Sequence, residues 1–170
     1  CYHYLEWPNQ GKPKILLIHG LKVDAHCWEK TAAYLTNNFH IYALDLKGHG
    51  KTANGAAHDP DYSLDQIASE LHEFYQVVLQ APFHIAGYSL GGQYAMHYAA
   101  QHPYSLRSLI LLDTAPDISA MGIFFLVILG AAKNRTYASR QELVDAFAKR
   151  GHREIGEYMA AHTVVDTPDG

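Results

Sequence analysis

The sequence is poor in cysteine and has no run of basic residues and no long apolar run. Its two cysteines, Cys1 and Cys27, provide neither a disulfide framework nor metal-ligand spacing, so we expect a reducing, cytoplasmic environment. The net charge of −4 without lysine or arginine clusters argues against nucleic acid or an anionic membrane as a partner. The longest uncharged stretch, residues 118–132, is shorter than the roughly 20 residues that span a bilayer. We therefore expect no membrane span, and a buried or lid helix there.

The 12 histidines do not form a metal-binding pattern either. None shows the paired helical spacing with a nearby carboxylate that a zinc site requires. We therefore expect no metal, and nothing in the sequence indicates a cofactor. The remaining composition, 48% hydrophobic and 18% charged, is that of a soluble chain able to bury one sizeable core.

Strand patterns and helix patterns alternate from the first residues to Pro116. Five segments have the composition of short strands, several of them apolar enough to be buried on both faces: 2–7, 14–19, 40–44, 83–86 and 106–112. Asp24 is expected to cap a helix reaching about residue 38, and Ser63 and Gln66 form a predicted capping box for a helix ending near Gln80. This alternation predicts an α/β fold, with a mostly parallel sheet covered by helices on both faces.

After Pro116 the alternation stops. Helical patterns cover 118–132, 140–150 and 154–162, and no strand pattern follows them. We therefore expect residues 1–116 to form part of the sheet core, and residues 117–170 to form a helical cap or lid region.

The stretch Gly87-Tyr88-Ser89-Leu90-Gly91 lies between a predicted strand and a predicted helix. In that context the spacing is typical of a nucleophile elbow. A sharp turn strains the central residue, and the two glycines keep the neighbouring backbone from colliding. The serine hydroxyl is thereby presented at a helix N-terminus, where free N–H groups favour developing negative charge.

With these motifs in order, residues 14–116 resemble the α/β-hydrolase family, specifically serine esterases with a helical cap. The resemblance is carried by His19-Gly20 after a strand, by the loop 45–52, and by the elbow 87–92. It implies that Ser89 is the nucleophile and that the N–H groups of Leu21 and Leu90 form the oxyanion hole. His19, Gly20, Gly87 and Gly91 would support the oxyanion loop and the elbow.

The family also places an acid and then a histidine after the serine, on later strands that this sequence does not show. We therefore expect the chain to be incomplete at its C-terminus and at its N-terminus. Asp113 is a candidate acid, because some family members place the acid at this strand end; the alternative is that Asp113 caps the turn into Thr114 and Ala115. His152 and His162 follow Asp113 but lie on charged helical faces, which favours a solvated role.

Asp45, another strand-end carboxylate, is expected to be structural. The apolar run Gly122–Leu129 suggests a substrate pocket lined by Phe124 and Phe125, with simple packing between cap and sheet as the alternative.

We predict a serine hydrolase that cleaves an ester or related acyl bond of a small apolar substrate through an acyl-enzyme, without a cofactor. The resemblance implies that dehalogenases of this family carry aspartate at the elbow, so a serine disfavours their chemistry. The alternative is a non-catalytic ligand-binding relative or an inactive fragment. The individual substrate and the oligomeric state stay open.

Overall fold

The computed structural model describes residues 1–52, 61–116 and 137–164. These residues fall into two units, Cys1–Ala115 and Pro116–Gly170, and each is described by itself.

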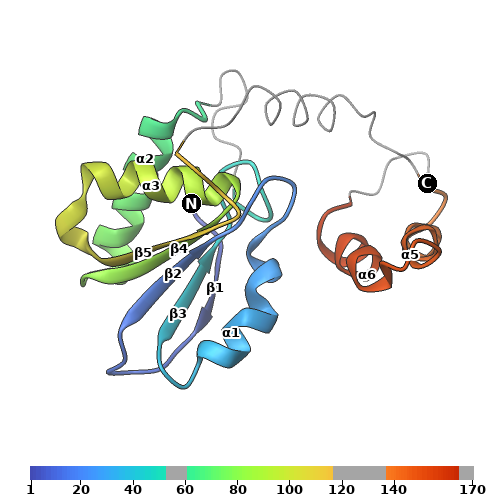
Figure 1. The fold of residues 1–170 in the computed structure, drawn as a ribbon, viewed down its shortest axis with the longest axis horizontal. Helices are drawn as coiled ribbons and strands as arrows, with labels where there is room; N and C mark the ends of the chain where they lie inside the picture. Colours follow the sequence, from blue (N-terminus) through green and yellow to red (C-terminus); the bar gives the residue numbers. More distant parts are fainter. Residues whose placement is uncertain (53–60, 117–136, 165–170) are drawn as a thin grey trace. The chain divides into compact units, whose positions relative to one another are not determined.

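The first unit is built on a five-stranded sheet with the order β1-β3-β2-β4-β5 (Figure 1). Its strands are β1 (Tyr4–Trp7), β2 (Lys14–Ile18), β3 (His40–Leu44), β4 (Phe83–Tyr88) and β5 (Leu106–Leu112). All neighbouring pairs are parallel except β1 with β3, so the predicted mostly parallel sheet is confirmed. β1 runs against the others because only a tight turn through Gly11 (φ 79°) joins it to β2, and a tight turn reverses the chain.

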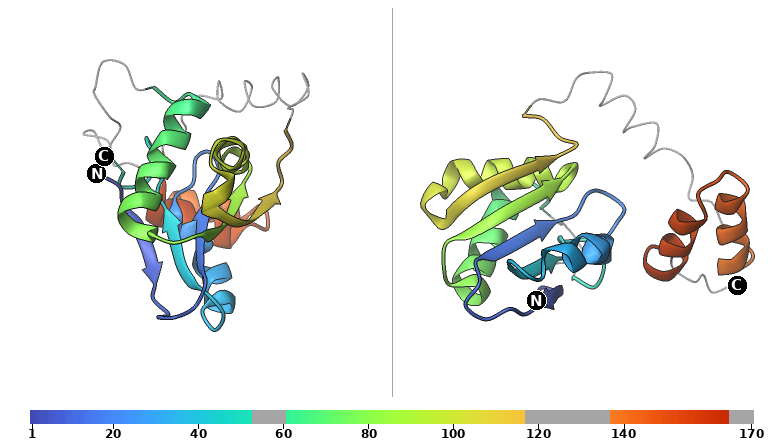
Figure 2. Two further views of the ribbon diagram at one scale, coloured as in Figure 1. Left: turned by 90° about the vertical axis from the view of Figure 1, so that its left-hand side faces the viewer. Right: turned by 60° about the horizontal axis from the view of Figure 1, so that its bottom comes forward.

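Helices lie on both faces of this sheet, as the alternation predicts. A 3₁₀ turn, η1 (Ala25–Trp28), leads into α1 (Glu29–Leu35) on one face, and α2 (Leu64–Phe74) and α3 (Leu90–Gln101) cover the other (Figures 1 and 2). α2 continues as a π-helical turn, η2 (Tyr75–Leu79), and a 3₁₀ turn, η3 (Pro103–Ser105), precedes β5.

Successive strand residues alternate between two cores, one under each layer of helices. Leu16 and Ile18 of β2 pack with the buried residues of α2 and α3, whereas Ile15 and Leu17 pack with Ala25, Trp28 and Ala32 beneath α1. Strands with apolar residues at every position are therefore buried on both sides, which explains their unbroken apolar runs.

The helix caps agree with the sequence in part. Asp24 caps η1 by accepting a hydrogen bond from the His26 N–H at 3.1 Å, but α1 ends at Leu35, earlier than expected. Ser63 accepts from the Gln66 N–H at 3.2 Å, which is half of the predicted capping box. The other half is different, because the Ser63 N–H donates to Asp61 and the Gln66 side chain reaches Glu70.

β5 forms an edge of the sheet among the described residues. Leu109 and Leu111 are each 37% exposed, and Ile110 and Leu112 are each 41% exposed. Both faces of this strand are therefore partly open to solvent, although its sequence is that of a fully buried strand.

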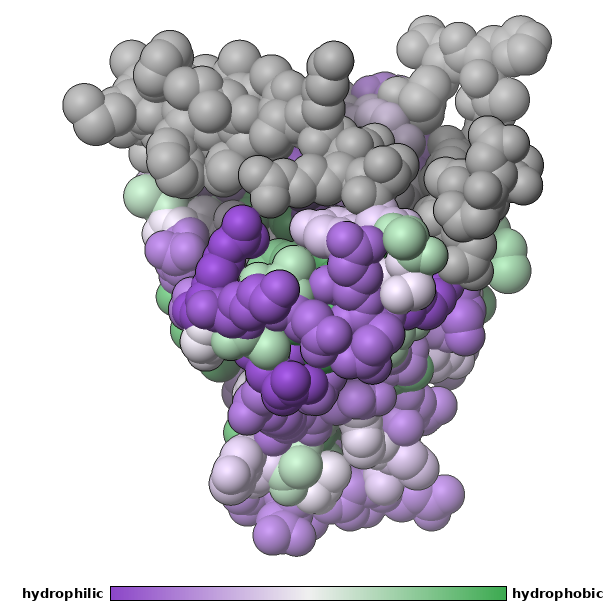
Figure 3. Space-filling view, turned by 90° about the vertical axis from the view of Figure 1, so that its right-hand side faces the viewer, coloured by the Kyte–Doolittle hydropathy of each residue, from purple (hydrophilic) through white to green (hydrophobic). Residues whose placement is uncertain are grey.

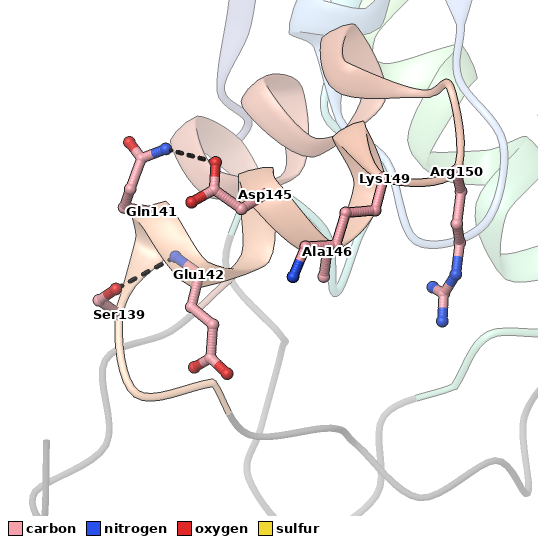
Figure 4. A pocket seen from close by; sticks show the side chains of 7 residues that line it. All are labelled: Ser139, Gln141, Glu142, Asp145, Ala146, Lys149 and Arg150. Atoms are coloured by element: carbon pink, nitrogen blue, oxygen red, sulfur yellow. Dashed lines mark hydrogen bonds between the residues drawn. The ribbon is translucent and has the colours of Figure 1, made fainter.

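The second unit contains α5 (Arg140–Ala148) and α6 (Arg153–His162), which agree with two of the predicted helices. Leu143, Val144 and Ala160 form its small core, and Gly156 lets the two helices meet closely. The coloured face seen in Figure 3 is mainly hydrophilic, and an open hollow is lined by residues of α5 and its two flanks (Figure 4). The predicted helix 118–132 lies outside the described residues. None of the described helices combines the length and the apolar character needed to cross a membrane.

Candidate active site

Ser89 lies at the junction of β4 and α3, in a backbone conformation that few serines adopt. Its φ is 51° and its ψ is −117°, outside the regions that L-residues favour. The Ser89 N–H donates to the Leu112 carbonyl at 2.9 Å, and the Ser89 carbonyl accepts from the Gly92 N–H at 2.9 Å. The strained residue is thus held from both sides, by strand β5 and by the first turn of α3.

Glycines surround this junction because the backbones meet there directly. A Cβ added to Gly87 would lie 2.4 Å from the Gly91 carbonyl oxygen, and one added to Gly91 would lie 2.4 Å from the His19 carbonyl oxygen. A Cβ on Gly20 would lie 3.2 Å from the Ser89 Cβ. These approaches bring the end of β2, and the loop that follows it, against the elbow.

His19 is fully buried, and hydrogen bonds occupy both of its ring nitrogens. Nε2 accepts from the Leu46 N–H at 3.0 Å, so Nδ1 carries the proton and donates to the Gly20 carbonyl at 2.7 Å. Burial lowers the pKa of His19, which keeps the ring neutral. His19 therefore ties the loop after β2 to the loop after β3 and has no free nitrogen for a base.

The structure brings the predicted oxyanion donors to the same end of the sheet. Ile18 pairs with Gly87 in adjacent parallel strands, so the residues after each strand leave the sheet side by side. Leu90 is the first residue of α3, and its N–H is one of those that a helix leaves without an internal partner. Leu21 follows Gly20 and is 49% exposed.

Asp113 follows β5 immediately and has a φ of 51°. Because Tyr88 pairs with Leu112, Asp113 is level with Ser89 on the neighbouring strand. Its carboxylate is exposed and has no hydrogen-bond partner within the described part of the chain. The turn after β5 is held instead by the side chain of Gln93, which sequence reasoning missed; its place four residues after Ser89, one helical turn away, is the signal that could have identified it.

Asp45 is buried, and its carboxylate is fully used within the fold. One oxygen accepts from the Ala25 N–H at 2.7 Å, and the other accepts from the Lys51 N–H at 2.8 Å and lies 2.6 Å from His3 Nδ1. These bonds join β1, β3 and η1, which supports a structural role.

His152 and His162 lie at the two ends of α6 in the second unit. Phe124 and Phe125 lie outside the described residues.

A sequence profile described as alpha/beta hydrolase fold matches residues 13–163. Monoacylglycerol lipase ABHD6 from Homo sapiens is 33% identical over 117 residues, which cover 68% of this chain and 34% of that protein. Fluoroacetate dehalogenase from a Burkholderia species is 33% identical over 106 residues, which cover 61% of this chain and 35% of that protein. The matched segments therefore span only about a third of the length of these curated relatives.

The fold also matches solved structures. A marine microorganism esterase superposes with a TM-score of 0.78 at 24% identity, over 99% of this chain and 66% of that one. This likeness extends the agreement from sequence to architecture. The chain belongs to the α/β-hydrolase fold family.

Proposed function

We propose that the protein is a serine hydrolase that cleaves esters or related acyl compounds through an acyl-enzyme on Ser89. The observation that carries this proposal is the strained backbone of Ser89 (φ 51°, ψ −117°) between β4 and α3. Nothing in the packing of the strand and helix requires a serine in this conformation, but presenting a hydroxyl at the tip of the turn does. Cys27 is a poor alternative nucleophile, since burial raises the pKa of its thiol to about 12.

In the first step, Ser89 Oγ attacks the acyl carbon, and its proton passes to a histidine base. The oxyanion that forms is bound by the N–H groups of Leu21 and Leu90, the tetrahedral intermediate collapses, and the leaving alcohol takes the proton. In the second step, the base takes a proton from water as the water attacks the acyl carbon. When this second tetrahedral intermediate collapses, the base returns the proton to Ser89 Oγ, and the acid is released.

No histidine bonds to the Ser89 hydroxyl within the ranges that the structure describes. Because the curated relatives are about twice as long as this chain, we propose that the base lies outside these 170 residues. Asp113 is proposed as the acid that orients this histidine, because Asp113 follows β5 at the same level at which Ser89 follows β4. The alternative is an acid from elsewhere in the protein.

The surroundings of Ser89 favour an apolar acyl group. Three large side chains near Ser89 are partly exposed: Leu21 (49%), Tyr88 (39%) and Leu112 (41%). Tyr88 precedes Ser89, the Leu112 carbonyl accepts from the Ser89 N–H, and Leu21 follows Gly20, which lies close to the Ser89 side chain. Covering them with an acyl chain would remove apolar surface from water. We also propose that Phe124 and Phe125 line the substrate pocket and that residues 117–170 form a helical cap.

The nucleophile is tested by intact-mass spectrometry of the full-length protein after reaction with a fluorophosphonate. We expect one adduct, absent from Ser89→Ala and retained in Ser108→Ala. Ser108 is a matched control because its hydroxyl also lies near a histidine, 2.8 Å from His84 Nδ1, but on β5 away from the elbow. A folded wild type without an adduct would favour a ligand-binding role, and an adduct retained in Ser89→Ala would contradict the assignment.

The oxyanion donor at Leu21 is tested with a proline, which lacks the N–H. Leu21→Pro should lower kcat about 10²–10³-fold, the usual effect of removing one oxyanion donor. Leu21→Ala keeps the N–H and should retain most of kcat. Equal losses in the two variants, at equal stability, would show that the side chain and not the N–H matters.

A further inference from the structure

Gln93 joins the first turn of α3 to the segment that leaves β5. Its side-chain nitrogen, Nε2, donates to the Thr114 hydroxyl at 3.3 Å and to the Ala115 carbonyl. A carboxamide nitrogen carries two N–H donors, so both donors are used on two consecutive residues. The bond to Thr114 is half-buried, which reduces the competition from water there, whereas the bond to Ala115 is exposed.

The same turn is held at two further points. The Thr114 methyl group packs on Gly92, where an added Cβ would lie 2.2 Å from Thr114 Cγ2. The Leu112 carbonyl accepts from the Ser89 N–H at 2.9 Å. Residues 112–115 are therefore fastened to the elbow over one helical turn.

Gln93 is bound to the nucleophile as well, because its own N–H donates to the Ser89 carbonyl at 3.3 Å. Its backbone thus contacts Ser89 while its side chain contacts Thr114 and Ala115. The turn after β5 and the Ser89 backbone are therefore both bonded to one residue, the first through the Gln93 side chain and the second through its main chain. Gln101, on the same helix, makes no such link, since its amide contacts Asp65 and His97 on the surface.

We propose that Gln93 is a positioning residue that fixes Thr114 and Ala115 as one wall of the approach to Ser89, and so determines how well long acyl groups bind. This inference rests on the proposed function. A carboxamide is required at this position: a leucine of similar size cannot donate, and a glutamate would place a carboxylate against the Ala115 carbonyl.

The contact itself is tested by a double-mutant cycle with Gln93→Leu and Thr114→Val, measured by urea unfolding of the full-length protein. The two substitutions together should cost less than the sum of their separate effects, because each removes the same hydrogen bond. We expect this coupling to be about three- to tenfold in the unfolding equilibrium constant. The matched cycle of Gln101→Leu with Thr114→Val should give no coupling. If the effects of the substitutions are additive in both cycles, the proposed link between Gln93 and Thr114 is overturned.

The positioning role is tested by kinetics. Gln93→Leu and Gln93→Glu should raise KM for long-acyl esters about tenfold, while the rate of Ser89 labelling by a small fluorophosphonate stays within about twofold of wild type. Gln101→Leu should change neither. A parallel loss of turnover and labelling at unchanged KM would mean that Gln93 only stabilises the fold.

The two proposals fail in different ways. A wild type that is folded but not labelled overturns the proposed function together with this inference. A wild type that is labelled, with an unchanged KM in Gln93→Leu, overturns this inference alone.

Discussion

Replacing His19 with alanine should destabilise the protein strongly, although His19 is not proposed to act in the reaction. The substitution leaves the Leu46 N–H and the Gly20 carbonyl buried without their partner, and each orphaned group costs about 1–3 kcal/mol. The two together predict a loss of about 2–6 kcal/mol, before any cavity is counted. Because whole domains are stable by only about 5–15 kcal/mol, this is a large share.

The loss of unfolding free energy in His19→Ala should depend on pH, and the lowered pKa of His19 determines the direction of this dependence. The unfolded chain, with an ordinary histidine pKa near 6.5, binds a proton more readily than the buried ring does. The contribution of neutral His19 is therefore fully present above about pH 6.5 and is lost as the pH falls further. His19→Ala should show a flatter dependence of unfolding free energy on pH in that range.

The measurement is urea unfolding of wild type, His19→Ala and His49→Ala between pH 5 and pH 8. His49 is the control, because its Nδ1 lies 3.1 Å from the Lys47 carbonyl of its own loop and its ring is only half-buried. A loss below about 1 kcal/mol in His19→Ala, or a loss equal to that of His49→Ala, would refute the reasoning from two orphaned groups.

Three further outcomes are expected. Gly87→Ala should lower stability by about 1–3 kcal/mol or more and abolish fluorophosphonate labelling, because its Cβ would lie 2.4 Å from the Gly91 carbonyl oxygen; an unchanged thermal melt would contradict this. His102→Phe should make stability less sensitive to acid below about pH 6.5, since burial and the stacked His72 ring, 3.9 Å away, lower the pKa of His102; identical acid transitions in the two proteins would count against it. We expect the 170-residue chain to self-associate through the β5 edge, where Ile110 is 41% exposed, and Ile110→Lys to weaken this association about tenfold or more by sedimentation; a wild type that stays monomeric, or an unaltered association, would exclude this edge as a contact.

The strands could be predicted from sequence where the signal is local. β3 and β5 occupy the expected residues, because each is an apolar run between turn-forming segments, and α5 and α6 begin within one residue of their predicted starts. The direction of β1 and the strand order could not be predicted, since pairing joins residues far apart in the chain, such as Trp7 with Ile41. The capping box failed in its second half for a similar reason, because Asp61 competes with Gln66 for the same N–H group.

The candidate site divides in the same way. Five consecutive residues around Ser89 predict the elbow, because a strand, a turn and a helix follow one another there. The links to Leu46 through His19, and to Ala115 through Gln93, depend on tertiary placement and are absent from any local pattern. The apolar composition of β5 predicts burial on both faces, and the described residues cover it only in part.

The frame that holds Ser89 is made almost entirely of main chain. Gly87 and Gly91 let segments of backbone meet without intervening side chains, and Gly20 leaves room for the Tyr88 ring and the Ser89 side chain. The side chain of Leu21 is 49% exposed, and that of Tyr88, whose ring lies against Gly20, is 39% exposed. A substitution of Leu21 would change the partly open surface beside Ser89 and leave the close contacts of Gly87 and Gly91 in place, so the surface and the backbone of the elbow can vary separately.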